Sequence, residues 1–161
     1  MAWFRRAQEV PPPPVAPEPD DTPAALSTRL ADLVAFVNRS AGRLPVEAVV
    51  AARRVTDVVR EILDDAAADA VPDVHVIIAV RGMVDDYLPT TLRTYLALDS
   101  GVVHEPSAHG VTPAVDLVEQ LDGLWLAGLD VLRAAQARDV DRLVTQGNFL
   151  RTKFSGSDLD L

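Results

Sequence analysis

The sequence predicts an all-α bundle of four or five helices, preceded by a disordered, proline-rich amino-terminal tail. Apolar residues recur at spacings of three and four from Leu26 to Phe154. The pairs Thr22-Pro23 and Thr112-Pro113 each suit an N-cap followed by proline at the first helical position. The chain has 161 residues, 48% of them hydrophobic, which is enough for one domain with a sizeable core.

Residues 1–22 form a separate zone, because the prolines of residues 11–19 remove backbone donors and fix φ. The zone begins with two aromatic residues beside two arginines, Trp3, Phe4, Arg5 and Arg6. One interpretation is a short anchor that touches a membrane surface or a protein partner, carried on a polyproline spacer. The other is an unselected start followed by a disordered linker, which the general disorder of chain ends favours.

The folded domain is predicted over residues 23–154, and its first helix begins at Pro23 and stops near Gly42. A second helix opens at Pro45 and runs to about Asp65. Its many valines lower the intrinsic helix propensity, so packing must stabilise it. The apolar stripes of these two helices are Leu26, Leu30, Leu33, Val34 and Val37 in the first, and Val46, Val49, Val50, Val55, Val58, Val59, Ile62 and Leu63 in the second.

Residues 74–80 are β-branched enough for a buried strand, but a lone strand would lack partners for its backbone hydrogen bonds. We predict a helix here, because Val74, Ile77, Ile78, Val84 and Leu88 continue the three-four spacing. Pro89 predicts a kink or restart near Tyr87 and Leu88. The apolar face then continues through Leu92, Tyr95, Leu96 and Leu98.

Residues 99–111 are predicted to form a loop, and the next helix starts at Pro113. Its apolar surface is broad, so we expect it to lie centrally and to bury Trp125, while Trp3 is exposed. A break at residues 138–139 precedes a last helix that ends near Phe154, and residues 155–161 should be frayed. The two stripes are Val115, Leu117, Val118, Leu121, Leu124, Trp125, Gly128, Leu129 and Leu132, then Val140, Leu143, Val144, Gly147 and Leu150.

Composition excludes several kinds of chemistry. Without cysteine there is no thiol nucleophile, disulfide or thiolate metal site. A net charge of -9 argues against broad nucleic-acid binding, which needs a dense basic face. The longest apolar run, Val74 to Val80, is far shorter than the roughly 20 residues that span a bilayer, and no apolar segment follows Arg5-Arg6 as in a signal peptide. We expect a cytoplasmic protein, with peripheral membrane contact as an alternative.

Few residues suggest a catalytic or metal site. Asp85 and Asp86 are consecutive, so on a helix they diverge by about 100° and cannot share a proton or metal. The spacing of His104 and His109 fits no compact metal motif. His75 is flanked by apolar residues, which is typical of a histidine in the core or at its boundary. There is no phosphate-binding glycine loop, GxSxG or HExxH. We therefore expect no catalytic residue, cofactor or metal.

One stretch carries a family resemblance. Residues 87–98, YLPTTLRTYLAL, resemble the bacterial family labelled 5-bromo-4-chloroindolyl phosphate hydrolysis protein and its actinobacterial relatives of unknown function. The end of the same kind of domain is similar to Asp139-Val140-Asp141-Arg142-Leu143, Gly147-Asn148-Phe149-Leu150 and Lys153-Phe154. The resemblance implies an all-helical, cytoplasmic or membrane-associated protein, of a kind discussed alongside toxic-anion and tellurite resistance proteins. It supplies no catalytic residues. The chain departs from family members that carry amino-terminal membrane helices.

The matching positions form one face on both sides of Pro89, and burial in the core is the preferred interpretation, with a partner groove as the alternative. This face consists of Tyr87, Leu88, Pro89, Leu92, Tyr95 and Leu96. We expect a non-enzymatic helical interaction or scaffold protein with a protein partner, in an envelope or toxic-anion stress system. The alternative is a phosphoester hydrolase, which the family label alone indicates and which would need metal or Lys/Arg clamps.

Overall fold

The computed structural model describes residues 20–106 and 110–155, and every regular element within them is helical. This confirms the all-α prediction, including the helix over residues 74–80. Predictions for residues 1–19, 107–109 and 156–161, among them the exposure of Trp3 and any role of Trp3, Phe4, Arg5 and Arg6, lie outside the described residues. The elements are α1 (Pro23–Ser40), η1 (Ala41–Arg43), α2 (Val46–Ala68), α3 (Val74–Arg81), η2 (Gly82–Tyr87), α4 (Leu88–Leu96), α5 (Pro113–Gln136) and α6 (Val140–Phe154).

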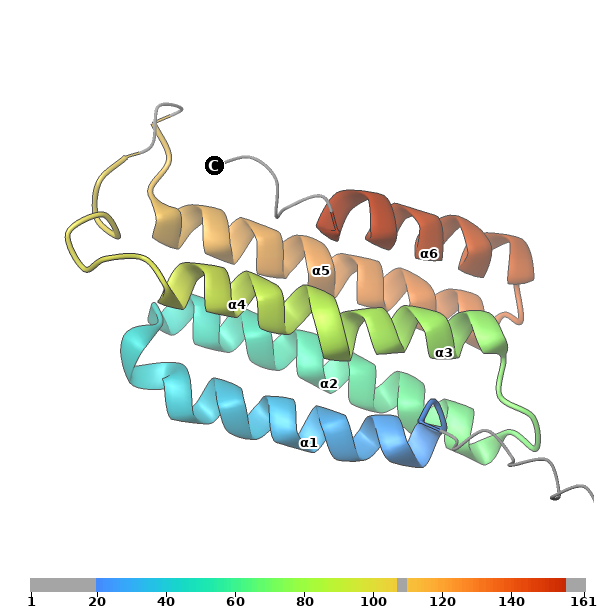
Figure 1. Ribbon diagram of the computed structural model, residues 1–161. Coiled ribbons are helices and arrows are strands. Elements are labelled where there is room, and N and C mark those ends of the chain that lie inside the picture. The colour runs from blue at the N-terminus through green and yellow to red at the C-terminus, as the bar shows by residue number, and fades with distance from the viewer. Residues whose placement is uncertain (1–19, 107–109, 156–161) are drawn as a thin grey trace, which may run out of the picture.

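The helices run up and down beside one another, with α3, η2 and α4 forming one continuous rod (Figure 1). Helix α2 packs against α1 and α5, and α6 packs against α5 and α3. The alternation places the start of α1, the α2–α3 connection and the α5–α6 turn at the same end of the bundle. No described helix combines the length and apolarity that a membrane span requires.

Side-chain caps fix where the helices begin. The Thr22 hydroxyl accepts from the Ala25 amide at 3.1 Å, and the Thr112 hydroxyl accepts from the Val115 amide at 3.4 Å. Both Thr-Pro starts are therefore confirmed. The same function is served by Asp73 at the start of α3.

The predicted restart near Pro89 takes the form of a π-helical segment, η2. Proline lacks the amide that would donate to the carbonyl four residues earlier. The chain widens instead, and the Leu88 amide donates to the carbonyl of Met83, five residues earlier. The widened turn also lays the ring of Tyr87 over Gly82, where an added Cβ would lie 2.7 Å from the Tyr87 ring.

The core is continuous through all the helices and consists mainly of leucine, valine and alanine. Alanines of α2, such as Ala48 and Ala52, are fully buried, and such small side chains allow neighbouring helices to approach closely. Gly128 serves the same purpose on α5, because a Cβ there would lie 2.8 Å from Val58 and 3.0 Å from Met83. Close α2–α5 packing thus depends on small residues.

The predicted apolar stripes are too wide, and several of their members are exposed. Small residues take the buried positions near the start of α2, and Val76 and Val80 are buried on α3 where Val74 and Ile78 were expected. The reason is geometric: a helix buries only the face that its neighbours cover, whereas apolar spacing alone does not mark the limits of that face. The exposed members are Val46, Val50, Val74, Ile78, Val115, Val140 and Val144.

Trp125 is also only partly buried, so the prediction that it is a core residue is wrong. It lies at the α2–α5 surface, where the Arg54 guanidinium stacks 3.6 Å from the ring centroid. The same guanidinium pairs with Asp122 at 3.2 Å. A tryptophan that combines apolar packing with a cation on its exposed face is stable at a boundary and does not require the core.

Candidate functional site

The face that carries the family resemblance is used in core packing. Leu88, Pro89, Leu92 and Tyr95 are buried, and Tyr87 and Leu96 are partly exposed. Burial raises the pKa of Tyr87, Asp86 raises it further, and Arg151 acts in the opposite direction. Burial also raises the pKa of Tyr95. Both phenols therefore stay protonated near neutral pH and are poor nucleophiles.

The adjacent carboxylates of Asp85 and Asp86 diverge in the structure. Asp85 pairs with Arg29 at 2.9 Å, and Asp86 accepts from the Thr90 hydroxyl at 3.4 Å. The Arg29 guanidinium also lies 3.5 Å from Asp21. Each carboxylate thus has a separate structural partner, and the two do not form an acid–base pair.

The histidines are likewise dispersed. His104 is exposed in the loop after α4, His109 lies outside the described residues, and His75 is half-buried in the first turn of α3. Within residues 20–106 and 110–155 no three His, Asp or Glu side chains converge as metal ligands. His75 nevertheless lines a cavity, which is described next.

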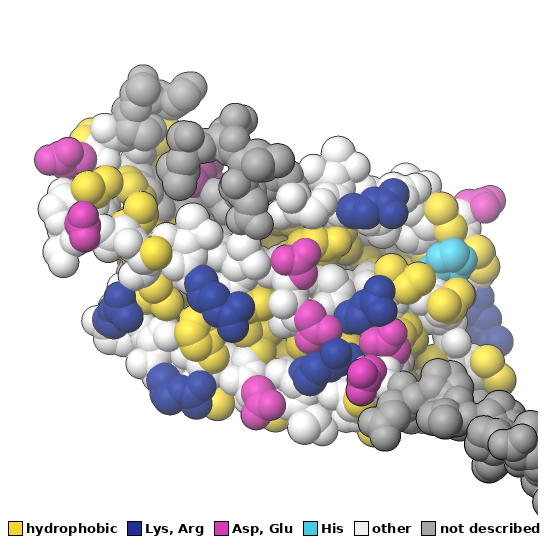
Figure 2. Space-filling view, viewed as in Figure 1, with side chains coloured by type: hydrophobic (Ala, Val, Ile, Leu, Met, Phe, Trp, Pro, Cys, Tyr) yellow, Lys and Arg dark blue, Asp and Glu magenta, His cyan; other side chains and the backbone are white. Residues whose placement is uncertain are grey.

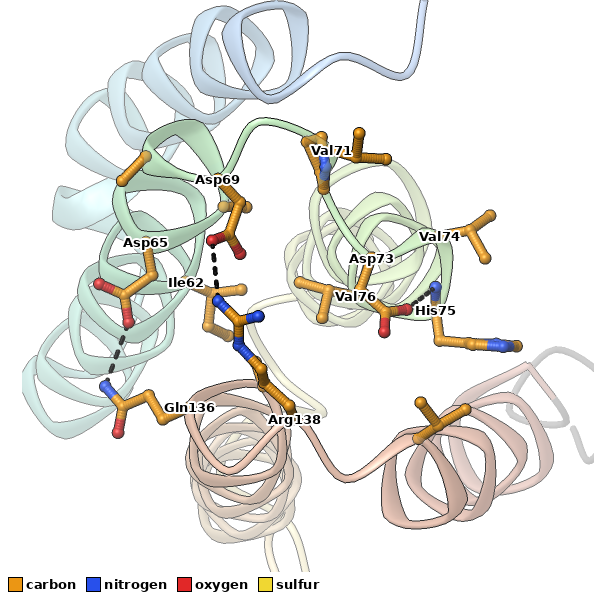
Figure 3. Close-up of a pocket in the computed structure, with 15 residues that line it drawn as sticks. Ile62, Asp65, Asp69, Val71, Asp73, Val74, His75, Val76, Gln136 and Arg138 are labelled. Carbon is orange, nitrogen blue, oxygen red and sulfur yellow. Dashed lines mark hydrogen bonds and ion pairs between the residues drawn. The ribbon is translucent and has the colours of Figure 1, made fainter.

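A cavity of about 760 Å³ opens at the end of the bundle where α2, α3 and the α5–α6 turn meet (Figure 3). We call it the end pocket. Its floor is apolar, since Ile62, Ala66 and Val76 are buried there. The full lining is Ile62, Asp65, Ala66, Ala68, Asp69, Val71, Pro72, Asp73, Val74, His75, Val76, Ala135, Gln136, Arg138 and Val140. Its size and apolar floor match those of sites that bind a ligand or an inserted side chain.

Three carboxylates border the end pocket. Asp65 accepts from the Gln136 side chain at 3.1 Å, and Asp69 pairs with Arg138 at 3.6 Å. Both links join the end of α2 to the end of α5 across the cavity (Figure 3). Asp73 accepts from the His75 amide at 2.8 Å and so caps α3. Among the described residues that line the pocket, Arg138 is the one lysine or arginine, so these side chains carry a net negative charge.

The backbone at Arg138 has a positive φ of 53°, the left-handed conformation that ends α5. Its amide donates to the Ala135 carbonyl at 3.0 Å. This turn directs the chain from α5 into α6. It also places Arg138 at the mouth of the end pocket, where the side chain is largely exposed.

The rim of the end pocket carries exposed apolar side chains in addition to its carboxylates. Val71 is 85% exposed, Val74 60% and Val140 48%. One turn further along the same helices, Ile78 on α3 and Val144 on α6 are exposed as well. Figure 2 shows a histidine side chain among hydrophobic ones at this end of the molecule. We call these five residues the valine rim.

Sequence reasoning did not identify this site, because its parts come from three separated segments. Asp69, His75 and Arg138 belong to no motif. A signal was present: an up-and-down bundle places alternate connections at the same end, and the connections after α2 and α5 are the second and fourth. The acidic and proline residues of 69–73 and the break at 138–139 were therefore candidates for a shared surface.

Comparison with protein-family models, with curated proteins and with solved structures finds no match for this chain. The resemblance of residues 87–98 to the 5-bromo-4-chloroindolyl phosphate hydrolysis protein family therefore stays a prediction.

Proposed function

We propose that this chain is a non-enzymatic interaction protein whose end pocket binds an apolar, basic segment of a protein partner. The observation that supports the proposal is the coincidence at one place of a cavity, an apolar floor, an exposed valine rim and carboxylates. Single exposed hydrophobic side chains are ordinary on protein surfaces, whereas a group of them around a concavity is typical of a binding site.

The apolar part of the partner would be held by the hydrophobic effect. Val71 and Val74 face water in the free protein, and covering each of them completely would contribute roughly 1.5 kcal/mol. The cavity volume of about 760 Å³ leaves room for one or two large side chains above Ile62 and Val76. Aromatic anchors in such pockets carry much of the binding energy in protein complexes.

The charge of the rim favours a basic partner. Asp65 and Asp69 are exposed, and their present partners are one amide and one exposed arginine. Such exposed pairs contribute little to stability, so exchanging Arg138 for an arginine of a partner costs little. A second basic group would meet a carboxylate without losing an existing strong contact. The attraction should weaken with added salt.

Position-specific photo-crosslinking in the native cell tests the proposal. A photo-reactive amino acid at Val71 should give a defined product with a second protein, and Val74→Lys should abolish it by opposing a basic partner. Val46→Lys is the matched control, because Val46 is 74% exposed at the start of α2, at the other end of that helix. A product that survives Val74→Lys, or the absence of any product from position 71, would contradict the proposal.

The hydrolase alternative has its own assay. Purified protein is incubated with 5-bromo-4-chloroindolyl phosphate, with and without added divalent metals. We expect no turnover above background. Metal-dependent turnover that is lost in Asp85→Asn or Asp86→Asn would replace the interaction role by a hydrolase role.

A further inference from the structure

The end pocket lies where the amino-terminal part of the chain leaves the bundle. Asp21 accepts from Arg81 at 2.7 Å, and Arg81 is the last residue of α3, whose first turn lines the pocket. Arg81 lies six positions after His75, which corresponds to about 9 Å along a helix. The start of α1 and the end pocket are thus neighbours at one end of the bundle (Figure 1).

The residues that precede Asp20 include side chains that are complementary to those of the end pocket. Trp3 and Phe4 have large apolar side chains, and Arg5 and Arg6 are the two basic residues among positions 1–19. The pocket offers an apolar floor, the valine rim and the carboxylates of Asp65 and Asp69. Aromatic rings against an apolar surface and guanidinium groups against carboxylates are complementary pairs.

We propose that Trp3, Phe4, Arg5 and Arg6 bind in the end pocket of their own chain, in competition with an external partner. The inference rests on the proposed function, since it names one occupant of the same pocket. Trp3 and Phe4 would cover Val71 and Val74, and the arginines would meet Asp65 and Asp69.

The length of the intervening chain permits this contact. Residues 7–19 reach about 40 Å if they extend as polyproline II, several times the distance along α3. Residues 7–10 contain no proline and leave room for the chain to reverse. A short tether gives an effective concentration in the millimolar range, so a contact that would be weak between separate molecules is substantially occupied within one chain.

Paramagnetic relaxation in the full chain tests the proposal. The sequence has no cysteine, so Ala2→Cys provides a single attachment point for a nitroxide label. We expect the amide signals of Val71, His75 and Arg138 to lose intensity at least twofold relative to the reduced label. Signals of Gly42 and Gly101 at the opposite end should be unchanged. A label at Gly42→Cys, where an added side chain meets nothing within 4 Å, is the matched control and should spare the pocket signals.

Three further samples decide between occupants. Trp3→Ala with Phe4→Ala, and separately Val74→Lys, should restore the pocket signals, whereas Val46→Lys should not. A mixture of protein that carries the nitroxide with isotope-enriched protein that lacks it reports contacts between two copies of the chain. We expect no loss of amide signal in this mixture. Signal loss in the mixed sample as large as in the labelled chain would assign the pocket to a second copy and overturn the proposal. The proposal would also be overturned if the labelled chain lost signal intensity uniformly, if it lost none, or if the loss at the pocket persisted after Trp3 and Phe4 were replaced.

The outcome is separable from that of the proposed function. If position 71 crosslinks to another protein and the nitroxide leaves the pocket signals unchanged, the pocket binds a partner but not its own amino terminus. If the nitroxide effect is present and no second protein is captured, the intramolecular contact stands while the partner role falls.

Discussion

Replacing Gly128 by alanine tests the close packing of α2 against α5. Gly128 is buried in the middle of α5, and an alanine Cβ would lie 2.8 Å from the Val58 side chain and 3.0 Å from the end of Met83. Carbon atoms pack at about 3.5–4.0 Å, so Val58 or the helix itself must move by close to 1 Å. Met83 can turn its terminal methyl away, but Val58 is held by a single stiff rotamer in α2.

The expected change in the free energy of unfolding is estimated by comparison with a second glycine, Gly147. Gly147 lies inside α6, and a Cβ there would meet nothing within 4 Å. Gly147→Ala should therefore show only the helix-propensity gain, about 0.5–1 kcal/mol of added stability. Gly128→Ala has the same gain but adds an overpacking cost of about 1–3 kcal/mol. The difference between the two variants isolates that steric cost.

Urea unfolding followed by circular dichroism measures both free energies of unfolding. Gly128→Ala should be less stable than Gly147→Ala by about 1–3 kcal/mol. In a Val58→Ala background the steric cost should largely disappear, and Gly128→Ala should then be close to neutral or stabilising. Equal stability of the two glycine variants in the original background would refute the packing described for α2 and α5.

Three other outcomes are expected. Thr112→Ala should lower the free energy of unfolding by about 1 kcal/mol, because it removes the cap of α5, and Thr112→Ser should restore most of it in urea melts. Trp125→Ala should cost about 2 kcal/mol, below the 3–5 kcal/mol of a fully buried tryptophan, in the same assay. Because burial raises the pKa values of Tyr87 and Tyr95 above 10.0, their contribution to stability is complete below pH 10 and is lost as the pH rises through the native pKa values. Urea melts from about pH 9 to about pH 11 should show this loss, and a Tyr87→Phe, Tyr95→Phe double variant should lack it.

The fold could be predicted because the starts of several helices are determined by residues close to them in the sequence. Thr22-Pro23 and Thr112-Pro113 fix two helix starts, and Pro89 forces the widened turn that joins α3 to α4. The strand alternative for residues 74–80 fails because a lone strand in a helical sequence would have no partner for its backbone hydrogen bonds. Such features act within a few residues of the chain.

The limits of burial could not be predicted in the same way. Val50 is exposed whereas the next residue, Ala51, is buried, because a helix buries only the face that neighbouring helices cover. Trp125 lies at the surface, where its ring is covered by the guanidinium of Arg54, 71 positions earlier in the chain. The end pocket combines the same two difficulties, since Asp69 and Arg138 become neighbours only after the bundle has formed.

Substitutions in the valine rim should weaken binding while leaving the free energy of unfolding nearly unchanged. Val74 and Val140 are already exposed, so their apolar side chains contribute little to the core. Val74→Lys and Val140→Lys should each change the free energy of unfolding by no more than about 0.5 kcal/mol, as surface substitutions do. Core valines give the contrast: Val55 is fully buried, and Val55→Ala should cost about 2 kcal/mol or more through lost burial and the cavity it leaves. If Val74→Lys instead destabilised the bundle by more than 1 kcal/mol in urea melts, the rim would be part of the packing, and its exposure would no longer indicate a binding surface.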